Sequence, residues 1–177
     1  MNTKEFIAQF LGIIGMILAV YSFQEKNNKR FFALQGLSGF MFFLNFILIS
    51  AYSAAFFNLA NLVRGTLYLK NDRKPIKLVT VLTLYTACFV FAVILMINSP
   101  MQIILSALTY ASLQLMSVLM WCGNGKYIRY GQFLIYSPSW LVHNIFNFSL
   151  GGILCEVFAM ASVVISFIRY GKDGFEK

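Results

Sequence analysis

The sequence predicts an all-α integral membrane protein with seven transmembrane helices. Three observations lead to this class: long apolar runs, one-sided basic residues and an internal repeat. Each run is close to the roughly 17–25 residues that a helix needs to cross the hydrocarbon core. The predicted spans are Phe6–Phe23, Phe31–Ser50, Ser53–Leu69, Leu78–Ile97, Met101–Trp121, Gly131–Phe148 and Gly151–Ile168.

The basic residues predict the orientation of these spans. Seven spans put alternate connections on the same side, and Lys4 is then the single Lys or Arg on one side. The other side receives Lys26, Lys29, Arg30, Lys70, Arg73, Lys74, Lys77, Lys126, Arg129, Arg169, Lys172 and Lys177, with Arg64 near the end of its span. Because basic residues are retained in the cytoplasm, we expect the N-terminus outside and the C-terminus inside.

The composition excludes a soluble domain, since 59% of the residues are hydrophobic, 11% are charged and the mean hydropathy is +0.74. A net charge of +8 can indicate nucleic-acid binding. Here the basic residues lie in short loops beside the spans, so topology accounts for them and the expected partner is the lipid bilayer. Cys88, Cys122 and Cys155 fall on different helices at different depths, so no disulfide, metal site or other cofactor is expected.

The chain also repeats itself at an offset of 98 or 99 residues. Asn45 then aligns with His143, Asn58 with Glu156, and Arg64 with Ser162. The fourth span has no counterpart, and an odd number of helices per repeat needs such an inverting helix. The prediction is a parallel 3+1+3 arrangement with a first triple-helix bundle (1–70), a linker and inverting helix (71–98), and a second bundle with a cytoplasmic tail (99–177).

Polar residues within the spans are few, and ionisable ones in a bilayer indicate function. Glu156 is the one acid within a predicted span and His143 the one histidine. Both are predicted at equal depth about the turn 149–152, as are Asn45 and Asn58 about the turn 50–53. Two interpretations stay open: these residues line a central solute site, or they clamp the helices together. As a further hypothesis, His143 and Glu156 form a proton relay.

Other polar side chains extend this candidate site. Asn61 and Arg64 follow Asn58 at helical spacing and share its face, although Arg64 could instead extend to the cytoplasmic surface. Trp140, His143 and Asn147 form one stripe on the sixth span. The predicted substrate-binding residues are Asn45, Asn58, Asn61, Trp140, His143, Asn147 and Glu156.

Two stretches carry a resemblance to a known family: Ser22-Phe-Gln24 through Asn61-Leu-Val-Arg64, and Ser137-Pro-Ser-Trp140 through Gly151-Gly-Ile-Leu-Cys-Glu156. They are similar to the YgjV family of bacterial inner-membrane proteins. The helix arrangement looks like the SWEET and PQ-loop transporter superfamily. The resemblance implies a multi-pass protein of the bacterial cytoplasmic (inner) membrane.

The superfamily resemblance also implies roles for residues. In SWEET-type transporters paired Asn residues bind the solute, and that role carries over to Asn58, with Glu156 at the second position. This departure indicates a cationic or amine-bearing solute. The stripe at Trp140, His143 and Asn147 is similar to one in nicotinamide riboside transporters. Phe23-Gln24 stands where PQ-loop proteins carry their Pro-Gln hinge.

The expected function is therefore a small-solute transporter that works by alternating access around a central polar site. The alternative is a non-transporting receptor, cargo-binding or structural membrane protein on the same fold. No enzymatic activity is expected, because no nucleophile–base arrangement, metal cluster or phosphate-binding loop is found in the sequence. The solute is not specified by the sequence, and whether copies associate as a homo-oligomer stays open.

Overall fold

The protein is all-helical in the computed structural model, which describes residues 3–22, 28–68 and 74–170. Within these ranges α6, η1 and α7 follow one another without a break, so the chain forms seven helical segments. The elements are α1 (Thr3–Ser22), α2 (Asn28–Leu48), α3 (Tyr52–Tyr68), α4 (Pro75–Leu95), α5 (Pro100–Cys122), α6 (Gly125–Gly131), the π-helix η1 (Gln132–Tyr136), α7 (Ser137–Phe146) and α8 (Leu150–Tyr170).

The seven segments match the seven predicted spans. Most ends agree within about three residues, but the sixth segment begins at Gly125, six positions before the prediction. By length and composition, three segments are long and apolar enough to cross a membrane: Thr3–Tyr21, Pro75–Leu95 and Pro100–Cys122. Gly36–Leu48 and Leu150–Ile165 are shorter apolar stretches. The sequence was right about the helices and about membrane character.

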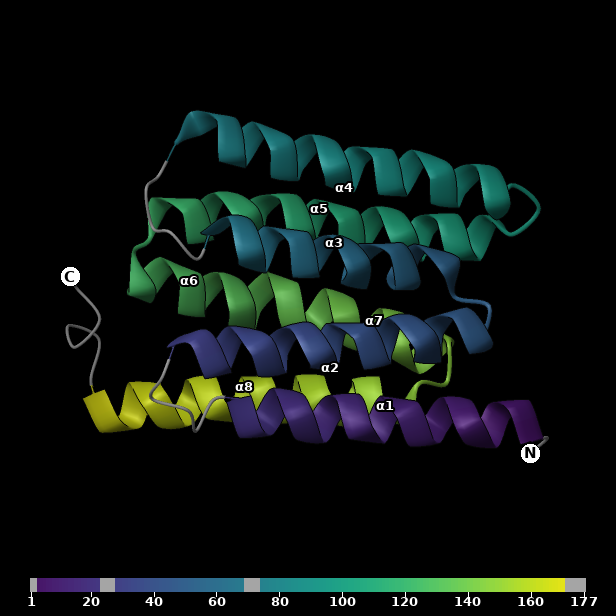
Figure 1. Cartoon of the computed structure of the whole chain (residues 1–177), viewed down its shortest axis with the longest axis horizontal. Coiled ribbons are helices and arrows are strands. Elements are labelled where there is room, and N and C mark those ends of the chain that lie inside the picture. Colours follow the sequence, from purple (N-terminus) through teal and green to yellow (C-terminus); the bar gives the residue numbers. More distant parts are fainter. Residues whose placement is uncertain (1–2, 23–27, 69–73, 171–177) are drawn as a thin grey trace.

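All the segments run side by side, and α4 lies on the outside of the assembly (Figure 1). The closest neighbours form a closed series: α1 packs on α2, α2 on α3, α3 on α5, α5 on the α6–α7 segment, α7 on α8, and α8 on α1. The α4 helix packs on α3 and α5. Six helical segments therefore surround a common interior, and α4 covers the junction of α3 and α5.

The α2–α3 and α7–α8 connections are built by the same hydrogen bonds, 98 residues apart. In the first, Ala51 N donates to Phe46 O (2.9 Å) and Ser50 N to Ile47 O (3.1 Å). The second repeats this pattern with Ser149 N to Asn144 O and Phe148 N to Ile145 O. Both are Schellman motifs, with Ser50 (φ 62°) and Phe148 (φ 52°) in the left-handed conformation.

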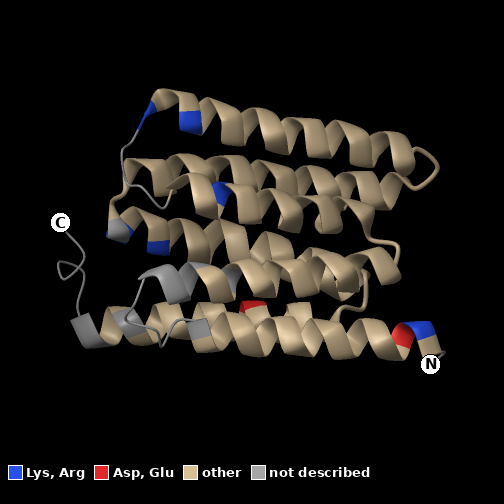
Figure 2. Cartoon of the chain, in the orientation of Figure 1, with Lys and Arg blue, Asp and Glu red and all other residues tan. Residues whose placement is uncertain are grey.

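The described basic residues define one end of the bundle (Figure 2). Lys74, Lys77, Lys126 and Arg129 lie at this basic end, where α4 and α6 begin. The opposite end, which carries the Schellman connections and the α4–α5 turn, is the turn end. Lys4 lies at the turn end, as the sequence predicts. Arg64 lies on α3 and Glu156 on α8, and Figure 2 shows a blue and a red segment between the two ends of the bundle.

Helices α1 and α8 approach each other through glycine. A β-carbon at Gly151 would overlap the backbone of Gly12, so only hydrogen fits at this position. Small residues allow such close helix packing in membrane proteins. By contrast, a β-carbon at Gly39 would make an ordinary contact with Asn58 O at 3.5 Å.

The Gly151→Ala variant should therefore lower the thermal stability of the detergent-purified protein. We expect a loss of about 1–3 kcal/mol, typical of overpacking, measured as a reduced midpoint in a thermal unfolding scan. Gly39→Ala is the matched control and should leave the midpoint nearly unchanged. Equal midpoints for the two variants would contradict the close approach of α1 and α8.

Candidate functional site

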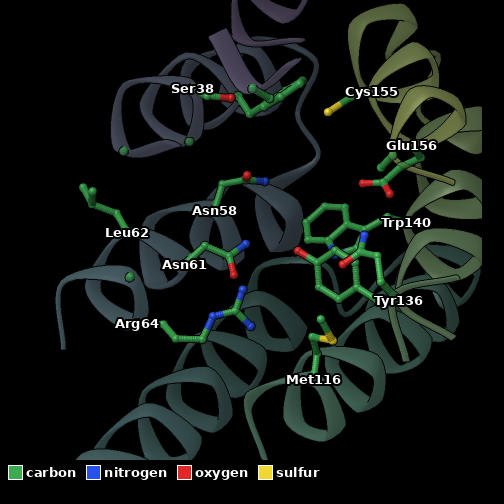
Figure 3. Close-up of a pocket in the computed structure, with 18 of the residues that line it drawn as sticks. Ser38, Asn58, Asn61, Leu62, Arg64, Met116, Tyr136, Trp140, Cys155 and Glu156 are labelled. Carbon is green, nitrogen blue, oxygen red and sulfur yellow. The ribbon is translucent and has the colours of Figure 1, made fainter. Parts of the chain in front are cut away.

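A cavity of about 400 Å³ lies inside the ring of helices (Figure 3). This volume is within the roughly 300–1,000 Å³ typical of small-molecule sites. Its lining extends toward the basic end, where Thr66 and Ile128 belong to it. The remaining lining residues are Ala19, Gly36, Ser38, Gly39, Phe42, Phe46, Asn58, Asn61, Leu62, Arg64, Gly65, Met116, Met120, Gln132, Tyr136, Trp140, Asn144, Gly152, Cys155, Glu156 and Ala159.

Part of the cavity wall is built from positions that match at the 98-residue offset. Both members of five pairs line it: Ser38 with Tyr136, Phe42 with Trp140, Phe46 with Asn144, Asn58 with Glu156, and Asn61 with Ala159. The first three pairs come from α2 and the η1–α7 segment, and the last two from α3 and α8. The second half supplies the larger or more polar member in most pairs, so the cavity is matched in position but not in chemistry.

Three polar atoms in this wall are buried without a hydrogen-bond partner. They are Trp140 Nε1, Asn144 Oδ1 and Glu156 Oε2. The Trp140 and Asn144 side chains are 3% and 2% exposed. Gly152 makes room for Asn144, because a β-carbon there would lie 2.6 Å from Asn144 Cγ. Since most buried polar groups are hydrogen-bonded, one donor and two acceptors left over in one cavity indicate a place for a polar ligand.

Arg64 reaches into the cavity and does not extend to the bundle surface. Its residue is 8% exposed, and the guanidinium Cζ lies 5.8 Å from the centre of the Tyr85 ring. The guanidinium Nη1 donates to Ser117 Oγ at 3.4 Å. It also interacts with the Tyr136 hydroxyl. These partners are neutral, so the cation meets no carboxylate among them.

Asn58 and Asn61 lie on the wall that carries Arg64, opposite Tyr136 and Trp140 (Figure 3). Asn58 Nδ2 donates to Ala54 O at 2.9 Å within its own helix. Asn61 Oδ1 accepts from the buried Tyr85 hydroxyl at 2.6 Å. These bonds hold both amides in place, and the sequence prediction that Asn58, Asn61, Trp140 and Glu156 share one space agrees with the cavity.

Asn45, His143 and Asn147 lie elsewhere, in a hydrogen-bonded group at the turn end. Asn45 Nδ2 donates to Ala8 O (2.7 Å), and its Oδ1 accepts from Ser149 Oγ (2.9 Å). His143 Nε2 lies 3.4 Å from Ser53 Oγ. We call this group the turn-end cluster, and its members are Asn45, Ser53, Gln102, Ser106, His143, Asn147 and Ser149.

The other members of the turn-end cluster form a second set of hydrogen bonds around Ser53 and His143. Ser53 Oγ accepts from Ser106 Oγ at 2.6 Å. Asn147 Nδ2 lies 3.3 Å from His143 Nδ1, and Asn147 Oδ1 accepts from Gln102 Nε2 at 2.9 Å. The cluster therefore joins α2 and α3 to α5, α7 and the start of α8. Three of the predicted residues, Asn45, His143 and Asn147, therefore belong to this cluster, and the other four line the cavity.

The structure does not place His143 and Glu156 at equal depth, and no hydrogen bond joins them in the part of the chain that it describes. The described hydrogen bonds of His143 go to Ser53 and Asn147. The turn is centred on Phe148, so His143 is five positions from it and Glu156 eight, a depth difference of about 4.5 Å. Trp140 is the residue at the depth of Glu156. Asn45 and Asn58 likewise lie five and eight positions from Ser50. The proton-relay hypothesis relied on equal depth of His143 and Glu156, which the structure does not show.

The sixth segment changes its helical geometry beside the cavity. Residues Gln132–Tyr136 form a π-helix immediately before Ser137 and Pro138. Proline cannot donate a backbone hydrogen bond and disturbs the preceding turn, which accounts for this geometry. Gln132 Nε2 donates to Ser137 Oγ at 2.8 Å, and both Gln132 and Tyr136 line the cavity. Single π-turns are frequent at functional sites. This π-helix was not predicted from the sequence.

The fold and the cavity define the class of this protein: a helical membrane protein with an interior cavity. Within the described residues no group of His, Cys, Asp and Glu is suited to hold a metal ion. The family model for bacterial inner membrane proteins of the YgjV type matches residues 6–173, so the chain belongs to that family. No curated protein and no solved structure matches the chain.

Double-mutant cycles test the separation of the turn-end cluster from the cavity. The pair Ser53→Ala and His143→Ala should show a coupling free energy of about 0.6 kcal/mol or more, as interhelical hydrogen bonds do in membrane proteins. The pair His143→Ala and Glu156→Gln should be additive within about 0.5 kcal/mol. Both are measured by unfolding in detergent, and strong coupling in the second cycle would contradict the assignment.

Proposed function

We propose that this protein is a small-solute transporter of the bacterial inner membrane and that the cavity between Asn58 and Glu156 is its solute site. The observation that carries the proposal is the set of unpartnered polar atoms on Trp140, Asn144 and Glu156 in a cavity of ligand size. A purely structural interior would pair these atoms or replace them with apolar groups. A solute supplies the missing hydrogen bonds.

The proposal includes a parallel repeat of two triple-helix bundles, α1–α3 and α5–α8, joined by α4. Three observations support it: the Schellman motifs 98 residues apart, the five matched pairs in the cavity wall, and the helix contacts. In the contacts, α1 packs on α8 as α3 packs on α5, which is what a two-fold axis along the membrane normal produces. Such repeats with a midplane site are a common construction in transporters.

The proposed topology places the basic end in the cytoplasm, the N-terminus outside and the C-terminus inside. The distribution of Lys and Arg supports it. In this orientation the cavity extends toward the cytoplasm, because Thr66 and Ile128 belong to its lining. The turn-end cluster and the contacts of Gln9 with Phe148 and Leu150 join the two bundles on the outer side. The arrangement corresponds to an inward-facing state.

Alternating access then requires the turn-end cluster to open while the cytoplasmic end closes. The π-helix η1 and Pro138 provide a hinge within the cavity wall, since irregular helical geometry bends more readily than an intact helix. This position replaces the Pro-Gln hinge that the first span lacks. The 3+1+3 arrangement supports placing the family with the SWEET and PQ-loop transporters, and the proposal assigns no catalysis to the chain.

A stability screen tests the solute site. The purified wild-type protein should be stabilised by one class in a panel of sugars, amino acids, polyamines, nucleosides and vitamin precursors, with a shift that follows ligand binding to the folded state. Glu156→Gln and Trp140→Ala should remove the shift. Val164→Ala, at a residue on the exposed surface of α8, is the matched control and should keep it. No stabilisation by any class would contradict the proposal.

A further inference from the structure

The cavity contains two side chains of opposite charge type that do not pair with each other. Arg64 has neutral partners: Ser117, the Tyr85 ring and the Tyr136 hydroxyl. Glu156 interacts with the Ser137 hydroxyl, and its Oε2 has no partner. No ion pair joins Arg64 to Glu156 within the described part of the chain. Isolated charges are costly in a membrane interior. A ligand that carries an anionic and a cationic group would therefore stabilise both Arg64 and Glu156.

The two groups stand at different depths on opposite walls (Figure 3). Counted from Ser50 and Phe148, Arg64 is fourteen positions along α3 and Glu156 eight along α8. Their α-carbons therefore differ in depth by about 9 Å. Side chains tilt toward the N-terminus of their helix, and α3 and α8 both begin at the turn end. Both side chains therefore tilt the same way, and the difference in depth changes little. A ligand that meets both needs its own charges several bonds apart.

The surroundings assign one end of the ligand to each group. Beside Arg64 stand Asn61 and the Tyr136 hydroxyl, which suit a carboxylate. Beside Glu156 stands Trp140, whose ring centre lies 6.2 Å from that of Tyr136. Aromatic faces next to a carboxylate suit an ammonium group. Counted in the same way, the apolar lining residues Leu62 and Ala159 are twelve and eleven positions along, between the depths of Glu156 and Arg64, and they suit a methylene chain.

We propose that the solute is dipolar, with an ammonium and a carboxylate separated by a chain of several atoms, as in an ω-amino acid or a short peptide. The inference rests on the proposed function and names the substrate class of the same site. The carboxylate binds at Arg64 and the ammonium at Glu156. An α-amino acid with an uncharged side chain carries its ammonium and its carboxylate on the same carbon and cannot reach both groups together.

A ligand series measures this spacing directly. Binding to the purified full-length protein is followed by calorimetry with glycine, β-alanine, 4-aminobutyrate, 6-aminohexanoate and 8-aminooctanoate. Alanylalanine tests the peptide alternative, and hexanoate and hexylamine are controls that carry one charge each. A spaced dipolar compound should bind at least tenfold more tightly than glycine, hexanoate or hexylamine. Equal binding of glycine, or of either singly charged control, would overturn the inference.

Two variants provide a readout that a structural role would not produce. In Glu156→Gln the advantage of 6-aminohexanoate over hexanoate should disappear, and in Arg64→Gln its advantage over hexylamine should disappear. Arg64→Lys keeps the charge and should retain at least part of the advantage of 6-aminohexanoate over hexylamine. It also replaces Arg64→Gln if that variant fails to elute as a single species in gel filtration. Unchanged preferences in folded variants would overturn the inference.

The inference and the proposed function fail in different ways. If a sugar, a nucleoside or a singly charged solute binds and requires Trp140, the cavity is a solute site and the dipolar assignment is wrong. If neither this series nor the broader panel binds, both proposals are wrong. Binding of spaced dipolar compounds with the expected variant preferences supports both.

Discussion

The interior of this protein depends on one constraint: a polar group carried into the membrane has to find its partner inside the bundle. The turn-end cluster satisfies the constraint completely for Asn45, whose amide is bonded to Ala8 and Ser149. The cavity satisfies it incompletely, since Trp140, Asn144 and Glu156 keep unpartnered atoms. In the turn-end cluster Gln102 Oε1 also lacks a partner, whereas the cavity collects three such atoms in one space, and this concentration marks the part of the bundle that we assign to a solute.

The sequence predicted the helices well because apolar length and basic flanks are strong local signals. Pro75 and Pro100, at the starts of α4 and α5, confirm that proline marks helix beginnings here. The exact turns were harder to predict. Ser50 and Phe148 adopt positive φ although neither is glycine or asparagine. With no glycine at either position, both turns were placed too late in the chain, which misplaced every depth counted from them.

The candidate site was predicted in part for the same reason. Asn58, Asn61, Trp140 and Glu156 line the cavity, but the displaced turn centre put His143 beside Glu156 rather than beside Ser53. Tyr136 and Asn144 were missed, although the tyrosine hydroxyl and the asparagine amide are both polar. The 98-residue offset was an available signal, since Trp140 aligns with Phe42 and Tyr136 with Ser38. Which of two polar residues faces the interior depends on how the helix is rotated about its own axis. This rotation cannot be predicted from a short sequence motif.

The central claim is that the cavity opens to the cytoplasm and is closed at the turn end. Side-specific labelling tests it most directly, with single cysteines at Gln132 or Ser53 in a chain whose Cys88, Cys122 and Cys155 are replaced by serine. A membrane-impermeant maleimide is applied to right-side-out and inverted vesicles. We predict that the cysteine at position 132 reacts only in inverted vesicles and that the cysteine at position 53 reacts in neither. Reaction of position 132 in right-side-out vesicles alone would contradict the account.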